Sequence, residues 1–134
     1  MGINLSIPIE PMGAVRMTQR GKFTSRSALK YLGYKDFIKL HVKNGAKGTF
    51  FTDGPIEVTI TFHMPIPASW SKKRRAAAAG IYHIKKPDAD NLVKGVFDSL
   101  NGIIWKDDNQ VAKVTATKLY GKTPKIEVFI RELE

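Results

Sequence analysis

The sequence contains no cysteine and only 12 acidic residues, against 22 lysines and arginines. Without thiolates, a divalent ion must be held by carboxylates, carbonyl oxygens and water, which are the ligands of Mg²⁺ or Mn²⁺. The absence of cysteine also excludes a disulfide framework. No apolar run approaches the roughly 20 residues that span a bilayer, and the N-terminus lacks the pattern of a signal peptide. We therefore expect a cytoplasmic protein with no membrane partner.

The charge that is present is strongly positive. A formal net charge of +10 favours a polyanionic partner, nucleic acid first and an anionic membrane surface second. The length of 134 residues and a hydrophobic fraction of 43% are typical of a globular domain. Because no repeat or linker divides the chain, we expect residues 1–134 to form one domain.

Alternation of apolar and polar residues predicts four strands. Pro8 indicates that the first strand ends there or lies at a sheet edge, because proline cannot donate a ladder hydrogen bond. The last two strands are separated only by residues 121–124, which predicts a terminal hairpin. The predicted strands are residues 3–9, 56–64, 111–119 and 125–130.

Helical periodicity accounts for most of the remaining chain. An apolar stripe that includes Tyr34, Phe37, Ile38, His41 and Val42 predicts a helix that ends at Gly45, with His41 packed and hydrogen-bonded. Two further helices follow, the last one capped by Asp90. The three predicted helices are residues 27–44, a short one that begins near Ser69 or Ser71 and ends at Gly80, and residues 91–100. This order predicts an α+β two-layer domain, a mixed sheet of about four strands with two main helices packed on one face.

Basic residues gather in two stretches. The loop of residues 10–27 could equally be a solvated linker or an arm that contacts phosphates. The run Lys72–Arg75 beside Trp70 could be a plain solvated face, but the net charge and the aspartates that follow favour a nucleic-acid contact. The candidates for contact with the DNA backbone are Arg16, Arg20, Lys22, Lys72, Lys73, Arg74, Arg75, Lys85 and Lys86.

The scarce aspartates also cluster, as Asp88 and Asp90 and then Asp107 and Asp108. Side chains two residues apart in an extended segment project to one side, where two carboxylates repel unless a cation or proton lies between them. The following helix rises ~15 Å, and the return from Gly102 can span roughly 20 Å. A third aspartate could thus join the pair and complete an Mg²⁺ site with positions open to water and phosphate. The alternative is that these aspartates only cap and brace the helix, since this pattern is common at caps and turns.

Lys94 stands four residues after Asp90, on the same face of the predicted helix. The spacing leaves two interpretations open. Lys94 could form an ordinary surface ion pair, or it could stabilise negative charge that develops on a phosphate bound beside a metal ion. We interpret Asp98 as solvated or paired with Lys94 rather than as catalytic.

Three segments, Lys86–Lys94, Phe97–Asn101 and Trp105–Val111, together resemble the RusA family of Holliday junction resolvases. In that family a D-x-D-N-L-x-K segment opens a helix and a D-D-x-Q-V segment follows it. The resemblance implies a homodimeric, Mg²⁺-dependent endonuclease, for which Mn²⁺ can substitute, without a small-molecule cofactor. Such an enzyme is a hydrolase that nicks four-way DNA junctions symmetrically in recombination and repair. By motif match, the metal ligands would be Asp88, Asp90 and Asp108, and the essential lysine would be Lys94.

Some assignments stay open at this point. Asp107 is an alternative to Asp108, and the segment Pro65–Lys86 is longer than the compact basic turn of the family, which could change the junctions that are bound. His83 lies near the predicted site by sequence, where a metal or phosphate role is one interpretation. Two rival functions remain, a metal-dependent nuclease for flaps or single strands and a basic DNA-binding module without catalysis.

Overall fold

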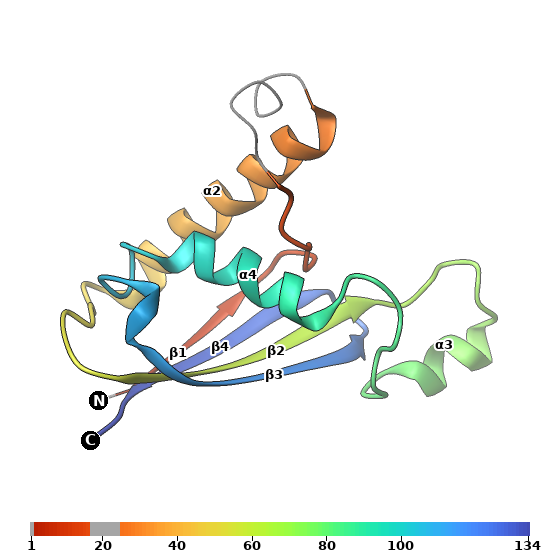
Figure 1. Ribbon diagram of the computed structural model, residues 1–134. Coiled ribbons are helices and arrows are strands. Elements are labelled where there is room, and N and C mark those ends of the chain that lie inside the picture. The colour runs from red at the N-terminus through yellow and green to blue at the C-terminus, as the bar shows by residue number, and fades with distance from the viewer. Residues whose placement is uncertain (1, 17–24) are drawn as a thin grey trace.

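A computed structural model describes residues 2–16 and 25–134 of the chain. Within these residues, four strands and three α-helices follow one another (Figure 1). The strands are β1 (Gly2–Ile7), β2 (Ile56–Pro65), β3 (Val111–Gly121) and β4 (Lys125–Glu132). The helices are α2 (Arg26–Ala46), α3 (Lys72–Ala78) and α4 (Ala89–Leu100), and a 3₁₀ turn, η1 (Asp108–Gln110), precedes β3.

The strands form one mixed sheet in the order β1-β4-β2-β3. Val58 in β2 faces Ile130 of the antiparallel β4 on one side and Val114 of the parallel β3 on the other. The predicted terminal hairpin is therefore wrong, because β2 lies between β3 and β4. Alternation predicts which face of a strand is buried but not which strands are its neighbours. The turn at residues 122–124 crosses two strand spacings of about 4.8 Å each, which is within reach of a chain that short.

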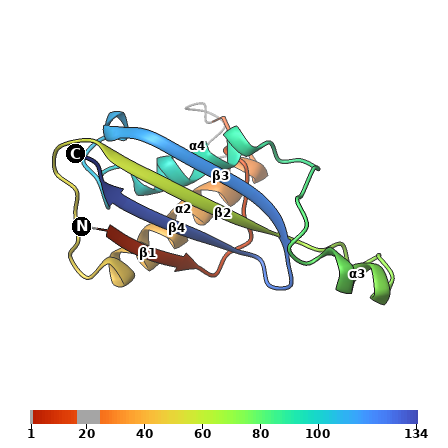
Figure 2. The same cartoon turned by 90° about the horizontal axis from the view of Figure 1, so that it is seen from below.

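The two long helices, α2 and α4, cover the same face of this sheet (Figures 1 and 2). The core lies between these layers and includes Trp105, which is fully buried and packs edge-on against Phe97 with ring centroids 5.4 Å apart. The predicted α+β two-layer fold is confirmed. The buried residues include Ile56, Val58, Ile60, Phe62 and Met64 from β2, Tyr31, Ile38 and Val42 from α2, and Leu92, Val96 and Leu100 from α4.

The helix α2 runs past its predicted end. Gly45 lies within the helix, which stops only at Lys47, a residue in the left-handed conformation with φ 51°. Ala46 is 6% exposed against the core, and this burial offsets the low helix propensity of the glycine before it. His41 donates from Nε2 to the carbonyl of Ser6 at 2.9 Å, which confirms its predicted packed role. Phe37 was expected in the buried stripe but is 41% exposed.

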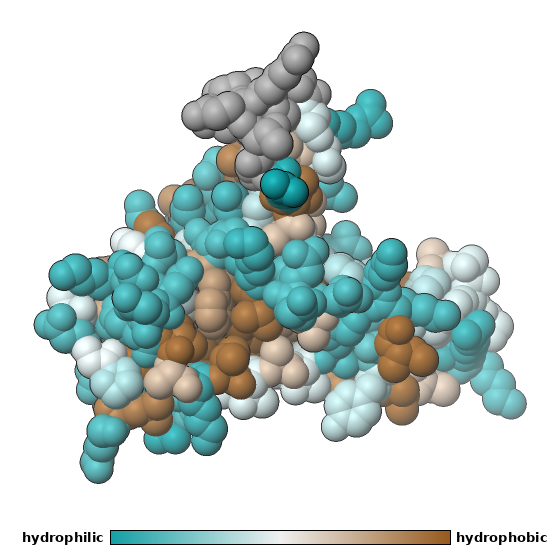
Figure 3. Space-filling view, in the orientation of Figure 1, coloured by the Kyte–Doolittle hydropathy of each residue, from teal (hydrophilic) through white to brown (hydrophobic). Residues whose placement is uncertain are grey.

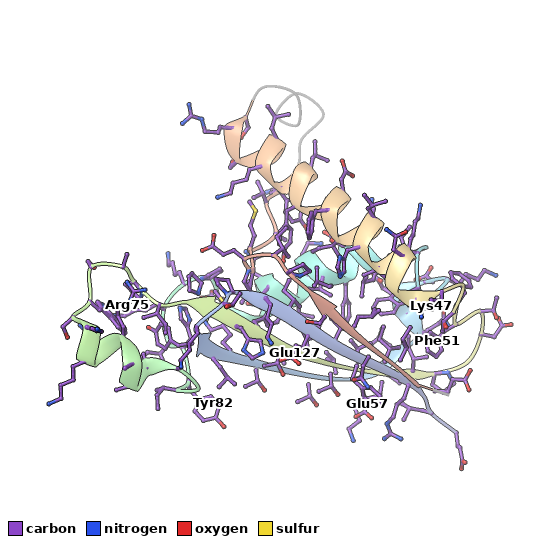
Figure 4. The ribbon with its side chains drawn as sticks, turned by 180° about the vertical axis from the view of Figure 1, so that it is seen from behind. Lys47, Phe51, Glu57, Arg75, Tyr82 and Glu127 are labelled. Carbon is purple, nitrogen blue, oxygen red and sulfur yellow. The ribbon has the colours of Figure 1, made fainter. Side chains whose placement is uncertain are left out.

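No described helix covers the opposite face of the sheet (Figure 2). His63 on this face contacts Glu127 of the neighbouring strand. Glu57 lies between two cations, with Arg131 Nε at 2.5 Å and Lys113 Nζ at 3.4 Å (Figure 4). The hydrogen bond from Arg131, followed by that from Lys113, lowers the pKa of Glu57 against the opposing effect of burial.

We expect Glu57→Gln to lower the free energy of unfolding at neutral pH, because the folded state favours the charged carboxylate. A lowered folded-state pKa contributes stability above the pKa of the unfolded state, and this contribution is lost as the pH falls through the folded-state pKa. The free energies of unfolding of both proteins, measured with urea between about pH 7 and about pH 3, should therefore converge at the acid end of this range. Asp53→Asn, at an exposed position, is the control. A difference that stays constant across this range would contradict the assignment.

Candidate metal and DNA-binding site

Asp88 and Asp90 lie at the start of α4 and face the same hollow. Asp88 is the N-cap in extended conformation and makes no capping hydrogen bond with its side chain, whereas Asp90 lies in the first turn and accepts the backbone N–H of Asn91 at 2.9 Å. The helix therefore begins two residues earlier than predicted, and Asp88 replaces Asp90 as its cap. Both aspartates are exposed. They line a hollow of about 560 Å³ together with Lys86, Pro87 and Asn91.

Lys118 of β3 holds the loop that precedes this aspartate pair. Its Nζ donates to the carbonyl oxygens of Lys85 at 2.6 Å and of Pro87 at 2.7 Å. The peptide bond between Lys86 and Pro87 is cis. Since one ammonium group binds carbonyls on both sides of Lys86, the backbone immediately before Asp88 is fixed to the sheet.

Asn91 connects the start of α4 with the N-terminal segment. Its side-chain amide donates to the carbonyl of Ala14 at 3.1 Å, and the Ala14 N–H donates to the Asn91 carbonyl at 3.1 Å. Gly13 has no room for a side chain here, because a Cβ would lie 2.6 Å from Asn91 Nδ2. Arg16 and Lys94 both line a second hollow, of about 510 Å³, which Asn91 also lines. Asn91 therefore borders both hollows.

Lys94 pairs with Asp98 one turn further along α4, with Nζ and Oδ1 3.6 Å apart. Tyr31 of α2 donates its hydroxyl to the other oxygen of Asp98 at 2.9 Å. Burial, followed by the hydrogen bond to Asp98, raises the pKa of Tyr31, so the hydroxyl keeps its proton. The side chain of Lys94 is 66% exposed. The predicted pairing of Asp98 is confirmed, and Lys94 keeps an ammonium group that is open to solvent.

Asp108 lies at the opposite end of α4. Its N–H donates to the side chain of Asn101, the C-cap of that helix, at 3.0 Å, and its carboxylate accepts the indole N–H of Trp105 at 2.7 Å. Burial raises the pKa of Asp108, and the nearby carboxylates of Asp98 and Asp107 raise it further, while the Trp105 N–H and Lys94 act against this shift. Asp107 caps η1 and accepts the N–H of Asn109 at 3.0 Å.

The carboxylates therefore form two separate groups in one chain. The 12 residues of α4 rise about 18 Å between the end that carries Asp88 and the end beside Asp108. Among the described residues, no group of three or more potential ligand side chains is placed to hold a metal ion. The prediction that the chain folds back to gather three carboxylates at one end of the helix is wrong, because Asn101 and Trp105 hold Asp108 where the helix ends.

The pair Asp88 and Asp90 by itself fits a magnesium ion. Mg²⁺ is usually bound by one or two carboxylates together with waters and substrate phosphates, because it dehydrates reluctantly. Both carboxylates are exposed and border one hollow that is large enough for hydrated ligands. The aspartate pair can hold such an ion with the remaining positions open to water and a phosphate.

The basic residues of the segment before α4 surround one end of the sheet. Lys72, Lys73, Arg74 and Arg75 are exposed on α3, which projects beyond the sheet (Figure 1). The guanidinium of Arg74 lies 3.6 Å from the centre of the Trp70 ring, and Trp70 packs on Tyr120 of β3 with centroids 5.4 Å apart. Lys85 and Lys86 are exposed beside Asp88, whereas Arg20 and Lys22 lie outside the described residues.

His83 does not reach the aspartates as a ligand in this conformation. Its ring packs edge-on against Tyr120 at 4.8 Å, and its Nδ1 is buried without a hydrogen-bond partner among the described residues. Burial, followed by the charge of Lys118, lowers the pKa of His83. These contacts point to a neutral, packed imidazole.

Sequence reasoning missed two residues that support the site. Lys118 appears in the sequence as one more lysine in a strand, and only the tertiary structure shows that it binds the loop before Asp88. Tyr31, which binds Asp98, could have been found from the sequence, because it lies three residues before Tyr34 and so on the same buried stripe of α2.

Two comparisons relate this chain to known proteins. Residues 8–131 match the protein family described as "Endodeoxyribonuclease RusA". The chain is also 37% identical over 127 residues to the "Uncharacterized protein YqaN" of Bacillus subtilis (strain 168), covering 92% of this chain and 87% of that protein. In the part of the chain that the structure describes, no helix is long and apolar enough to cross a membrane.

We expect Lys118→Met to weaken Mn²⁺ binding at the Asp88 and Asp90 pair by about 10- to 100-fold, the usual effect of removing a group that orients metal ligands. Calorimetric titration with Mn²⁺ measures this directly and needs no DNA. Lys122→Met removes an exposed lysine close to the end of the same strand and should leave the affinity unchanged. Equal affinities in both variants would contradict a positioning role for Lys118, provided that their thermal unfolding is similar.

Proposed function

Because the chain belongs to the RusA family of endodeoxyribonucleases, we propose that it is a Mg²⁺-dependent hydrolase that cuts four-way DNA junctions by paired nicks in recombination and repair. The observation that carries this proposal is the placement of Asp88 and Asp90. They are exposed together in one hollow and directly follow a segment, residues 65–87, that contains six lysines or arginines and no acidic residue. The enzyme would act on DNA in the cytoplasm without a small-molecule cofactor.

In this proposal, Asp88 and Asp90 would hold Mg²⁺, and the bound ion would supply an activated water and charge neutralisation at the phosphate. The first turn of α4 adds backbone N–H groups that favour a bound phosphate. Lys94 is available to the same phosphate, because exposed ion pairs such as that with Asp98 contribute only ~0.2–1 kcal/mol. We assign Lys94 the stabilisation of negative charge in the transition state.

The exposed cations of residues 72–75, together with Arg16, Lys85 and Lys86, would bind the sugar-phosphate backbone. Such contacts release counterions, so affinity should fall steeply with salt concentration. Backbone contacts carry no sequence information by themselves, which leaves any preference for branched DNA to other features of the surface.

We further propose that the enzyme is a homodimer in which Asp108 of one protomer completes the metal site of the other. Asp108 and the pair of Asp88 and Asp90 lie at opposite ends of α4 in one chain. An apolar strip lies between these ends, along α4 and β3 (Figure 3), and includes Val93, Phe97 and Val114, the last of which is 48% exposed. A two-fold axis through this strip and perpendicular to α4 would set two α4 helices antiparallel and bring opposite ends together.

The proposed activity is tested by incubating a labelled four-way junction with the protein in Mg²⁺, beside a linear duplex and a flap of the same sequence. We expect paired nicks on the junction alone. Asp90→Asn should bind the junction and reduce cleavage by at least about 10²-fold, since it removes a ligand of the metal that activates the nucleophile.

Other results of this assay would separate the rival functions. Cleavage of flaps or single strands but not junctions would indicate a metal-dependent nuclease of different specificity. Binding of DNA without cleavage in Mg²⁺ and in Mn²⁺ would overturn the enzyme assignment and leave a basic DNA-binding module.

The composite site is tested by mixing two inactive variants. A dimer of one Asp90→Asn protomer and one Asp108→Asn protomer would contain one complete site, formed by Asp88 and Asp90 of the second protomer and Asp108 of the first. We therefore expect the mixture to recover single nicks. Asp90→Asn mixed with Asp88→Asn is the control and should stay inactive, because both sites then lack a ligand. No recovery in the first mixture, when exchange of protomers is shown by a tag, would contradict the shared site.

A further inference from the structure

Three large apolar side chains stand exposed next to the basic residues of the segment before α4. Ile81, Tyr82 and Ile84 are 57%, 72% and 86% exposed. Figure 3 shows this apolar surface beside hydrophilic residues at the end of the molecule that carries α3, and Figure 4 shows Tyr82 pointing away from the sheet. Single exposed apolar residues are common on protein surfaces, but three within four consecutive positions indicate a contact surface.

The backbone that carries these side chains is fixed to the sheet. The Gly80 N–H donates to the Tyr120 carbonyl at 2.8 Å, and the Tyr120 N–H donates to the Ile81 carbonyl at 2.9 Å. The His83 N–H donates to the Lys118 carbonyl at 3.0 Å, so this segment acts as a short additional strand beside β3. Tyr82 and Ile84, two residues apart along it, project to the same side. A rigid presentation of this kind lowers the entropy lost on binding.

The charge around these residues limits what can bind them. Lys85 and Lys86 follow Ile84 directly, and the four cations of α3 precede the segment, with no acidic residue anywhere in residues 65–87. The partner must therefore offer both negative charge and apolar faces. DNA offers both where its bases are unstacked, as they are at a branch point, whereas an intact duplex keeps its base faces hidden within the stack.

The surface also lies close to the proposed site of cleavage. Ile84 is four residues from Asp88, a distance of at most about 14 Å along an extended chain. Lys118 binds the two carbonyls that lie between them. At a rise of about 3.4 Å per nucleotide along one strand, this distance corresponds to roughly four nucleotides. A base bound by these side chains would therefore lie within a few nucleotides of the scissile phosphate.

We propose that Tyr82 and Ile84 contact unstacked bases at the branch point of the DNA and thereby give the protein its preference for branched over linear DNA. Tyr82 stacks on a base and Ile84 fills the space left between separated base pairs, as apolar wedges do in other DNA complexes. The basic residues around them bind backbone in any DNA. This inference rests on the proposed function, because it assigns the structural selectivity of that activity.

The test compares affinity for a four-way junction and for a duplex of the same sequence, using Asp90→Asn protein so that no DNA is cut. Tyr82→Ala and Ile84→Ala should each weaken junction binding by about fivefold or more and leave duplex binding and its salt dependence unchanged. They should also abolish the change in fluorescence of 2-aminopurine placed at the branch point. Tyr82→Phe should retain junction binding, because it keeps the ring.

Two further variants serve as controls. Leu40→Ala removes an apolar side chain that is 64% exposed on α2, away from the basic segment, and should have no effect on either DNA. Lys73→Ala should weaken junction and duplex binding alike and lower the salt dependence of both, because it removes a backbone contact.

Each outcome has a separate meaning. Absence of junction cleavage by the unmutated protein in Mg²⁺ and in Mn²⁺ would refute the proposed function, and the inference with it. Equal binding of junction and duplex by the Asp90→Asn protein would refute the inference alone, because there would be no binding preference to assign. A clear junction preference that survives in Tyr82→Ala and Ile84→Ala would refute the inference alone. Loss of binding to anionic phosphatidylglycerol vesicles in these variants, with junction binding intact, would show that the surface contacts membranes instead and would likewise overturn it.

Discussion

The parallel pairing of β2 and β3 is the constraint on which the arrangement of the site depends. Parallel neighbours must be joined by a crossover that carries the chain back to the end of the sheet where it started. Here α4 makes this return (Figures 1 and 2). The residues before the helix, including Asp88, therefore lie at one end of the sheet, and the residues after it, including Asp108, lie at the other. No local change in loop conformation would remove this separation.

The strand β3 supports most of what lies at the aspartate end. Within three consecutive residues, the Lys118 side chain holds the loop before Asp88, Leu119 bridges to Tyr82, and Tyr120 packs against Trp70 and His83. The loop before Asp88 and the basic segment are thus attached to one rigid element. Precise positioning of carboxylates is easier on a strand and a helix than on a free loop. This attachment explains how so exposed a group of residues can still keep a defined geometry.

The sequence predicted the local features of this protein well and its long-range pairings poorly. Alternation in residues 56–64 located the central strand, and the D-x-D segment located the start of α4 to within two residues, because these signals are local. The neighbour of β3 could not be predicted, since the same alternation is compatible with a hairpin to β4 or with a crossover beside β2. The position of Asp108 was mispredicted for a similar reason. The chain is long enough to bring Asp108 to Asp88 and Asp90, but the side chains of Asn101 and Trp105 hold it at the other end of α4.

The division of the carboxylates along α4 has a consequence for control of the activity. If each cutting centre needs residues from two chains, an isolated protomer carries only half a centre and is harmless to any DNA it meets. Formation of the cutting species then depends on the square of the protomer concentration, so a modest fall in expression would reduce it disproportionately. A nuclease built in this way is restrained by dilution alone, without an inhibitor or a lid.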